Sequence, residues 1–229
     1  MADQKKNEPG SSLIETLRLS ELPEILEDIA ELGLDNALQD GLAKDIPIVN
    51  WIVGLGKTVI AVRDYFLIKK ILRFFQGLDE VTQKERAEFL GRIEDDEKYG
   101  QRVGETIVML LDRYDHLDKA YLMSKLFCAY GRQQIDFNEF LRISSSIDRA
   151  FIRDLNDLLA YFADEEIQDA EVKRAKRNLY TSDFSDFYVI TDEEFKRSDL
   201  EHPQVYHFNQ RATKFAEIIL GGKYHGDRW

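Results

Sequence analysis

Proline is almost absent from the middle of this chain, and that absence constrains the fold more than any other feature. The chain has four prolines in 229 residues, and none lies between Pro47 and Pro203. Proline inside a helix removes a hydrogen bond and clashes with the preceding turn, so a long stretch without it favours helices. Apolar residues in this stretch recur at intervals of three and four, which is typical of amphipathic helices. We therefore expect a mainly α protein.

Start and stop signals divide this pattern into separate helices. Ser20 is a predicted N-cap, and Gly33 ends the helix that follows it. Further helix starts are predicted at a capping box of Thr82 with Glu85, at Asp118, and at a second capping box of Asp136 with Glu139. After the second capping box, the helical pattern runs on through Ile147, Phe151, Leu155, Leu158 and Phe162.

The C-terminal part has a different pattern. Residues 172–180 are predicted to be helical, and FYVI (187–190) and VYHF (205–208) are short β-type runs. Asn209 then caps a predicted final helix that ends at Gly221. The order helix, strand, loop, strand, helix resembles that of a winged-helix module. The expected fold class is therefore a helical bundle with a small winged-helix-like α+β C-terminal part.

Charge and hydropathy divide the chain further. Residues 1–45 carry 4 Lys or Arg against 11 Asp or Glu, a net charge of −7, whereas residues 46–75 carry five basic residues and one acid. We predict four parts: a flexible tail (1–12), an acidic helical segment (13–45), a helical domain (46–163) and a winged-helix-like domain (164–229).

Composition excludes some broad classes of function. The formal net charge is −12, which disfavours wide non-specific binding to nucleic acid, because such binding needs a positive surface. The chain has one cysteine, Cys128, so no disulfide can form within it. The opening MADQKKNEPGSS has no apolar core of the kind found in a signal peptide. We expect a cytoplasmic protein.

The stretch WIVGLGKTVI (51–60) resembles the end of a nucleotide-binding P-loop. Gly56, Lys57 and Thr58 match the end of the motif, but Trp51 stands where its first glycine is required. Pro47 also lies where the preceding strand should run. The stretch therefore predicts no nucleotide site. Gly54 and Gly56 are explained as places where a buried helix bends or packs closely.

The same stretch opens the most hydrophobic segment of the chain, residues 46–75. A spanning helix is disfavoured, because the apolar run is short and is interrupted by Asn50 and Lys57. Two readings remain: a core helix, or a basic amphipathic surface that docks on a partner or a membrane. On the second reading, the surface consists of Lys57, Arg63, Lys69, Lys70, Arg73, Phe74 and Phe75.

The other candidate motifs do not predict a metal site or an active site. GRQQIDFNEFL lacks the oxygen ligands and the glycine of a calcium loop. Asp112, Asp115 and His116 have a spacing that could share a metal, but acidic clusters on one helix are usually solvated. We assign no catalytic residue, no cofactor and no metal ligand. A cryptic helical enzyme around this cluster is kept as a third hypothesis.

The densest basic cluster lies in EVKRAKRNLY. It consists of Lys173, Arg174, Lys176 and Arg177. This cluster could contact DNA, but residues 150–229 have a net charge of −5 and the presumed wing is rich in acids. We expect a structural or protein-binding module here, with a DNA-binding transcriptional regulator as the alternative.

Three runs of sequence carry a resemblance that extends over residues 46–220. They are IPIVNWIVGLGKTVIAVRDYFLIKKILRFF, ERAEFLGRIEDDEKYGQRVGETIVMLLDRYDHLDKAYLMSKLF and FLRISSSIDRAFIRDL. The chain resembles a group of uncharacterised bacterial proteins from mobile-element and phage-defence neighbourhoods. The resemblance implies a conflict-related role and supplies no catalytic residues.

The sequence thus predicts a non-enzymatic interaction or effector protein that uses residues 46–75. We expect a protein partner or a homo-oligomer, with peripheral membrane contact as a further option. In the resting state this segment would be covered, with the acidic 1–45 region as the candidate cover.

Overall fold

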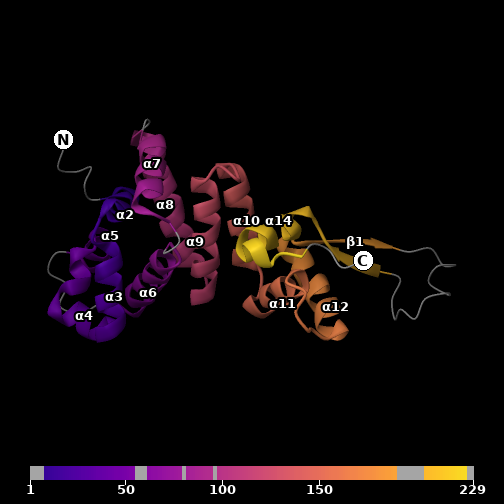
Figure 1. The fold of residues 1–229 in the computed structure, drawn as a ribbon. Coiled ribbons are helices and arrows are strands. Elements are labelled where there is room, and N and C mark those ends of the chain that lie inside the picture. Colours follow the sequence, from indigo (N-terminus) through magenta and orange to yellow (C-terminus); the bar gives the residue numbers. More distant parts are fainter. Residues whose placement is uncertain (1–7, 55–60, 79–80, 95–96, 190–203, 226–229) are drawn as a thin grey trace. The chain divides into compact units, whose positions relative to one another are not determined.

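The computed structural model describes residues 8–54, 61–78, 81–94, 97–189 and 204–225 (Figure 1). These residues form a mainly helical protein with one small antiparallel sheet, which confirms the predicted mainly α class. Their contacts divide the chain into two compact units: unit 1, Met1–Ile135, and unit 2, Asp136–Trp229.

Unit 1 is helical throughout its described residues. Its elements are α2 (Pro9–Arg18), α3 (Leu22–Leu32), α4 (Leu34–Asp40), η1 (Leu42–Asp45), α5 (Pro47–Val53), α6 (Val62–Gln76), α7 (Gln83–Glu94), α8 (Glu97–Arg113) and α9 (Leu117–Gly131).

Helix α2 packs extensively against α8, and two glycines set how closely they approach. A Cβ atom at Gly104 would lie 2.4 Å from the Gly10 carbonyl oxygen, and one at Gly10 would lie 2.3 Å from the Gln101 carbonyl oxygen. The two backbones therefore touch without side chains between them. The prediction of a flexible tail through residue 12 differs from this arrangement, because α2 begins at Pro9 and buries Gly10 and Ser12.

The apolar run after Pro47 is not one continuous helix. Pro47 occupies the first turn of α5, where its missing N–H costs nothing, and α5 ends at Gly54, whose φ is +68°. Its buried residues face the acidic region, since α5 packs on α2 and η1. The Ile48 amide also donates a hydrogen bond of 3.1 Å to Thr16 Oγ1 on α2.

The core of unit 1 continues through aromatic contacts. Phe74 of α6 packs on Phe127 of α9 with ring centroids 5.5 Å apart, and Phe127 meets Phe89 of α7 at 4.9 Å. Phe89 in turn contacts Tyr130. Edge-on pairs of this kind add to the hydrophobic stabilisation of the buried area. They join α6, α7 and α9.

Unit 2 combines helices with a hairpin. Its elements are α10 (Phe137–Arg149), α11 (Ile152–Phe162), α12 (Asp169–Asn178), η2 (Leu179–Ser182), β1 (Ser185–Val189), β2 (Gln204–Phe208), α14 (Gln210–Leu220) and η3 (Gly221–Lys223). The helical pattern predicted through Phe151 breaks there, because Ala150 and Phe151 adopt extended backbone angles between α10 and α11. Phe151 is 72% exposed.

The two strands pair antiparallel with Phe187 opposite Tyr206 and Ser185 opposite Phe208. Phe208 packs on Tyr161 and Phe162 of α11, with ring centroids at 5.2 and 5.7 Å. Helix α11 also contacts α12 and α14. The predicted division between residues 163 and 164 would cut through this core, whereas the compact units divide at Ile135 and Asp136.

Several predicted caps are present. Thr82 and Glu85 form the full capping box, with the Thr82 amide 2.9 Å from Glu85 Oε2 and the Glu85 amide 3.2 Å from Thr82 Oγ1. Asp136 accepts from the Glu139 amide, and Asn209 accepts from two amides of α14. The prediction for Asp118 was wrong: His116 caps α9, and its Nδ1 accepts from the Asp118 amide.

Candidate functional site

The predicted surface on residues 46–75 is only partly accessible. Phe74 and Phe75 are buried in unit 1, and so is Lys70. Arg73 lies over the Tyr121 ring at 4.7 Å and is 3.7 Å from an Asp118 carboxylate oxygen. The C-terminal half of α6 therefore belongs to the core, where the prediction had placed it on the surface. Lys57 lies outside the described residues, as do Gly56 and Thr58.

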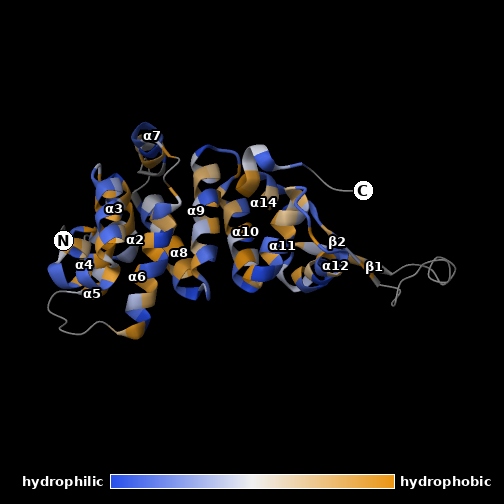
Figure 2. Cartoon of the chain, turned by 60° about the horizontal axis from the view of Figure 1, so that its bottom comes forward, coloured by the Kyte–Doolittle hydropathy of each residue, from blue (hydrophilic) through white to orange (hydrophobic). Residues whose placement is uncertain are grey.

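The accessible part is the N-terminal half of α6. Val62 is 74% exposed and Phe66 is 54% exposed, and they lie one turn apart on the same face. Figure 2 shows hydrophobic residues at this end of the helix. The exposed Arg63 lies beside them, and Lys69 follows with its ammonium 5.3 Å from the Tyr65 ring centre. An exposed apolar pair with basic neighbours is the pattern expected of a contact surface.

Asp112, at the C-terminal end of α8, is an anchor for α6. Arg63 donates two hydrogen bonds to its carboxylate, and these hold the pKa of Asp112 below its usual range. The Lys70 ammonium donates to the carbonyls of Asp112 and Tyr114 at 2.8 and 2.9 Å. Burial lowers the pKa of Lys70. These carbonyls lie at the C-terminal end of α8, where the helix dipole is negative. Hydrogen bonding to them therefore favours the charged form of Lys70.

The other two residues of the Asp112, Asp115 and His116 cluster also have structural contacts. Asp115 is 2.7 Å from the buried Lys119, and His116 serves as the cap of α9. Within the part of the chain that the structure describes, no group of three or more His, Cys, Asp or Glu could hold a metal ion. The polar groups at this junction stabilise the turn from α8 to α9, and nothing in their geometry favours the enzyme hypothesis.

The basic cluster of α12 is divided between two roles. Arg174 pairs with Asp157 and lies 3.6 Å from Asp154, and Lys176 lies over the Tyr161 and Phe208 rings. Lys173 and Arg177, four residues apart, are exposed. Two of the four predicted DNA contacts are therefore used inside unit 2. The acid-rich segment between the strands lies outside the described residues.

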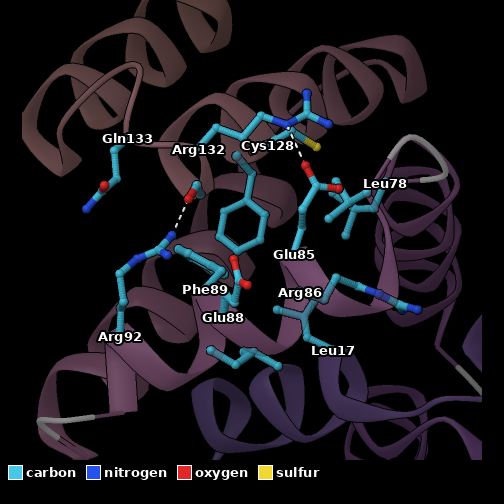
Figure 3. A pocket seen from close by; sticks show the side chains of 14 residues that line it. Leu17, Leu78, Glu85, Arg86, Glu88, Phe89, Arg92, Cys128, Arg132 and Gln133 are labelled. Carbon is cyan, nitrogen blue, oxygen red and sulfur yellow. Dashed lines mark hydrogen bonds and ion pairs between the residues drawn. The ribbon is translucent and has the colours of Figure 1, made fainter.

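Unit 1 also contains a hollow of about 290 Å³ that the sequence did not indicate (Figure 3). It lies between α7 and the end of α9. Its polar side chains are Glu85, Arg86, Glu88, Arg92, Arg132 and Gln133. Glu85 accepts from Arg132 Nε at 3.2 Å, and its hydrogen bonds with Thr82 hold the pKa of Glu85 below its usual range. Arg92 donates to the Gly131 carbonyl.

Sequence reasoning missed two of these features for different reasons. The exposure of Phe66 had a signal, because a large apolar residue occupies the same face as Arg63, Lys69 and Arg73. The hollow had none, because α7 and α9 are separated in sequence and only their packing forms it.

None of the helices in the described ranges is both long and apolar enough to span a membrane. Comparison of the chain with protein-family models, with curated proteins and with solved structures gives no match.

Proposed function

We propose that this protein is a non-enzymatic interaction protein that binds a partner protein through the N-terminal half of α6. The observation that carries the proposal is the exposure of Val62 and Phe66, 74% and 54%, on a helix whose other half is buried. Large apolar side chains that do not contribute to the core, placed one turn apart, are the anchors used when a helix lies in a groove.

The charges around these anchors indicate the character of the groove. The exposed Arg63 follows Val62, and Lys69 follows Phe66. Arg63 is already paired with Asp112, so Lys69 carries the charge that favours a partner with an apolar groove and an acidic rim. Such charges raise the rate of association and help to exclude wrong partners.

The acidic N-terminal region is well placed to regulate this segment. Hydrogen bonds link it to residues 46–75: Thr16 accepts from the Ile48 amide, and Asp35 accepts from Tyr65. An effector that releases α6 when this region moves would fit these contacts. The resemblance to proteins of phage-defence neighbourhoods supports a bacterial, conflict-related role.

A photo-crosslinking experiment tests the proposal. A photoreactive phenylalanine analogue replaces Phe66 in cells that express the protein, and the same analogue replaces Phe151 as a control. Phe151 is 72% exposed and lies in unit 2, so it matches Phe66 in chemistry and accessibility. We expect a discrete cross-linked protein from position 66 that is absent from position 151. Its mass also shows whether the partner is a second copy of the chain.

Two results would contradict this proposal. Equal cross-linking from both positions would show that exposure alone causes capture. Flotation with liposomes, lost on Phe66→Ser, would assign α6 to a membrane surface instead of a protein groove.

A second candidate function is DNA binding by unit 2. The observation in its favour is the order of α11, α12 and an antiparallel hairpin, with Lys173 and Arg177 exposed on α12. This order fits a winged-helix module. If these residues contact phosphates, the double substitution Lys173→Gln and Arg177→Gln should reduce the salt dependence of DNA binding by about two counterions. Unchanged mobility-shift curves would reject this candidate.

A further inference from the structure

The hollow beside α7 adjoins a second one in unit 1. The first, about 290 Å³, is lined by Phe89, Leu90 and Phe127 among others. The second, about 350 Å³, lies against α3 and the end of α6, and Leu22, Leu26 and Phe75 contribute to its mostly apolar walls. Small-molecule sites begin at about 300 Å³, so the first hollow is close to that size and the second exceeds it.

Three residues line both hollows: Leu78, Val81 and Arg86. Arg86 is thus the charged side chain that the two hollows share. In Figure 3 it extends toward the side where Leu17 and Leu78 lie, whereas the Glu85 carboxylate next to it points toward Arg132.

Arg86 differs from the other arginines of the first hollow. Arg132 donates to Glu85, and Arg92 donates to the Gly131 carbonyl. The Arg86 Nε atom is buried and has no acceptor among the described residues. A buried donor without a partner destabilises the folded state, and more so when it is charged. An anion in the hollow would supply the missing acceptor.

We infer that the two hollows bind a small amphiphilic carboxylate, such as a medium-chain fatty acid, with its carboxylate on Arg86. The planar guanidinium suits a carboxylate, because two parallel N–H donors can face its two oxygens. The apolar body would pack against Phe89, Leu90 and Phe127. Glu85 and Glu88 also line the first hollow, and their negative charge disfavours a polyanion such as a nucleotide. The head group is therefore a single negative charge.

Cys128 provides a direct readout of occupancy. It lines the first hollow and is buried, and it is the chain's single cysteine. A thiol reagent therefore reports on this position alone. A ligand in the hollow should slow the reaction of Cys128 by blocking access to its sulfur atom.

The test uses the full chain with three probes: decanoate, 1-decanol and acetate, each below the concentration at which it forms micelles. Decanoate at about ten times its Kd should slow the modification of Cys128 roughly tenfold, because protection follows the unbound fraction. Acetate lacks the apolar body and 1-decanol lacks the charge, so neither should give this protection.

Variants identify the role of Arg86. Arg86→Gln should abolish protection by decanoate, and Arg86→Lys should retain part of it, because lysine keeps the charge but loses the paired donors. Arg102→Gln on α8 is the control, since Arg102 lines neither hollow. Circular dichroism and thermal melting establish that each variant is folded, and calorimetry measures decanoate binding by the wild type directly.

Two outcomes would overturn the inference. Equal protection by 1-decanol would show an apolar cavity without an anion site. No binding of decanoate to the wild-type chain would show that the hollows hold no amphiphile. Neither outcome affects the proposed α6 surface, because Val62 and Phe66 do not line these hollows.

Discussion

At the scale of single residues, the contact of Gly104 with Gly10 leaves no room for a side chain at either position. Gly104→Ala would place a methyl group 2.4 Å from the Gly10 carbonyl oxygen, so α2 and α8 must separate. We expect a loss of about 1–3 kcal/mol in the free energy of unfolding, as for other overpacked sites. Urea denaturation measures it.

Gly91→Ala in α7 is the matched control, because among the described residues no atom beyond its chain neighbours and the nearby backbone of α7 lies within 4 Å of its Cβ position. Alanine is the better helix former, so this variant should gain about 0.5–1 kcal/mol. Equal effects of the two substitutions would contradict the backbone contact between α2 and α8.

Asp112 predicts a specific dependence of stability on pH. Hydrogen bonds from Arg63 hold its folded pKa below the ordinary value of 3.8. Its contribution is therefore complete above about pH 3.8 and is lost as the pH falls through the folded pKa, because the unfolded chain takes up the proton first. Asp112→Asn should show a shallower loss of unfolding free energy in acid than the wild type.

Arg63→Gln supplies the complementary variant for that titration. It removes the main cause of the lowered pKa of Asp112 while leaving the carboxylate in place. Its acid dependence should resemble that of Asp112→Asn. If the wild type and both variants lost stability in parallel as the pH falls, the pairing of Arg63 with Asp112 would contribute nothing to the free energy of unfolding.

At the scale of elements, α6 has two halves with different roles. Phe74→Ala should cost about 3–5 kcal/mol, because Phe74 is fully buried and packs on Phe127. Phe66→Ala should change the free energy of unfolding by no more than about 0.5 kcal/mol, since Phe66 is exposed. Both variants carry the same substitution in the same helix, and chemical denaturation compares them directly. A large loss at Phe66 would show that this face is packed and would remove the basis of the proposed function.

The elements also show why helix limits were harder to predict than helix content. The apolar spacing through Ile147, Phe151 and Leu155 is continuous in the sequence, yet the backbone becomes extended at Ala150 and Phe151. The break leaves Ala150 buried while Phe151 is exposed. Apolar periodicity indicates which residues could share one face of a helix. Whether the chain breaks into two short helices depends on the elements that those helices pack against.

At the scale of the whole molecule, the division at Ile135 and Asp136 predicts that the units fold separately. A fragment of residues 136–229 retains the Asp136 cap of α10 and the aromatic core around Phe162. We expect helical circular dichroism and a cooperative thermal transition from this fragment. A fragment of residues 164–229, which lacks α10 and α11, should be unfolded.

The opposite result would support the boundary that the sequence predicted. A folded 164–229 fragment would show that α12, the hairpin and α14 need no packing from α11. Comparison of the two fragments under the same conditions separates these divisions.

The sequence by itself determined the features that depend on neighbours in the chain. The scarcity of proline and the apolar spacing indicated helices, and the side chains of Thr82, Asp136 and Asn209 marked where three of them begin. Each of these is a local effect, in which a side chain meets a backbone group a few residues away. The two short strands were predicted for the same reason.

The tertiary structure alone decided which faces became core and which polar groups met. Phe66 and Phe74 lie in the same helix, but Phe74 is buried and packs on Phe127 of α9, whereas Phe66 is exposed. Contacts between distant segments pair Arg63 with Asp112 and place Arg86 at both hollows. Burial and pairing depend on which surfaces pack together in space. The spacing of residues along one helix does not show which other helices pack against it.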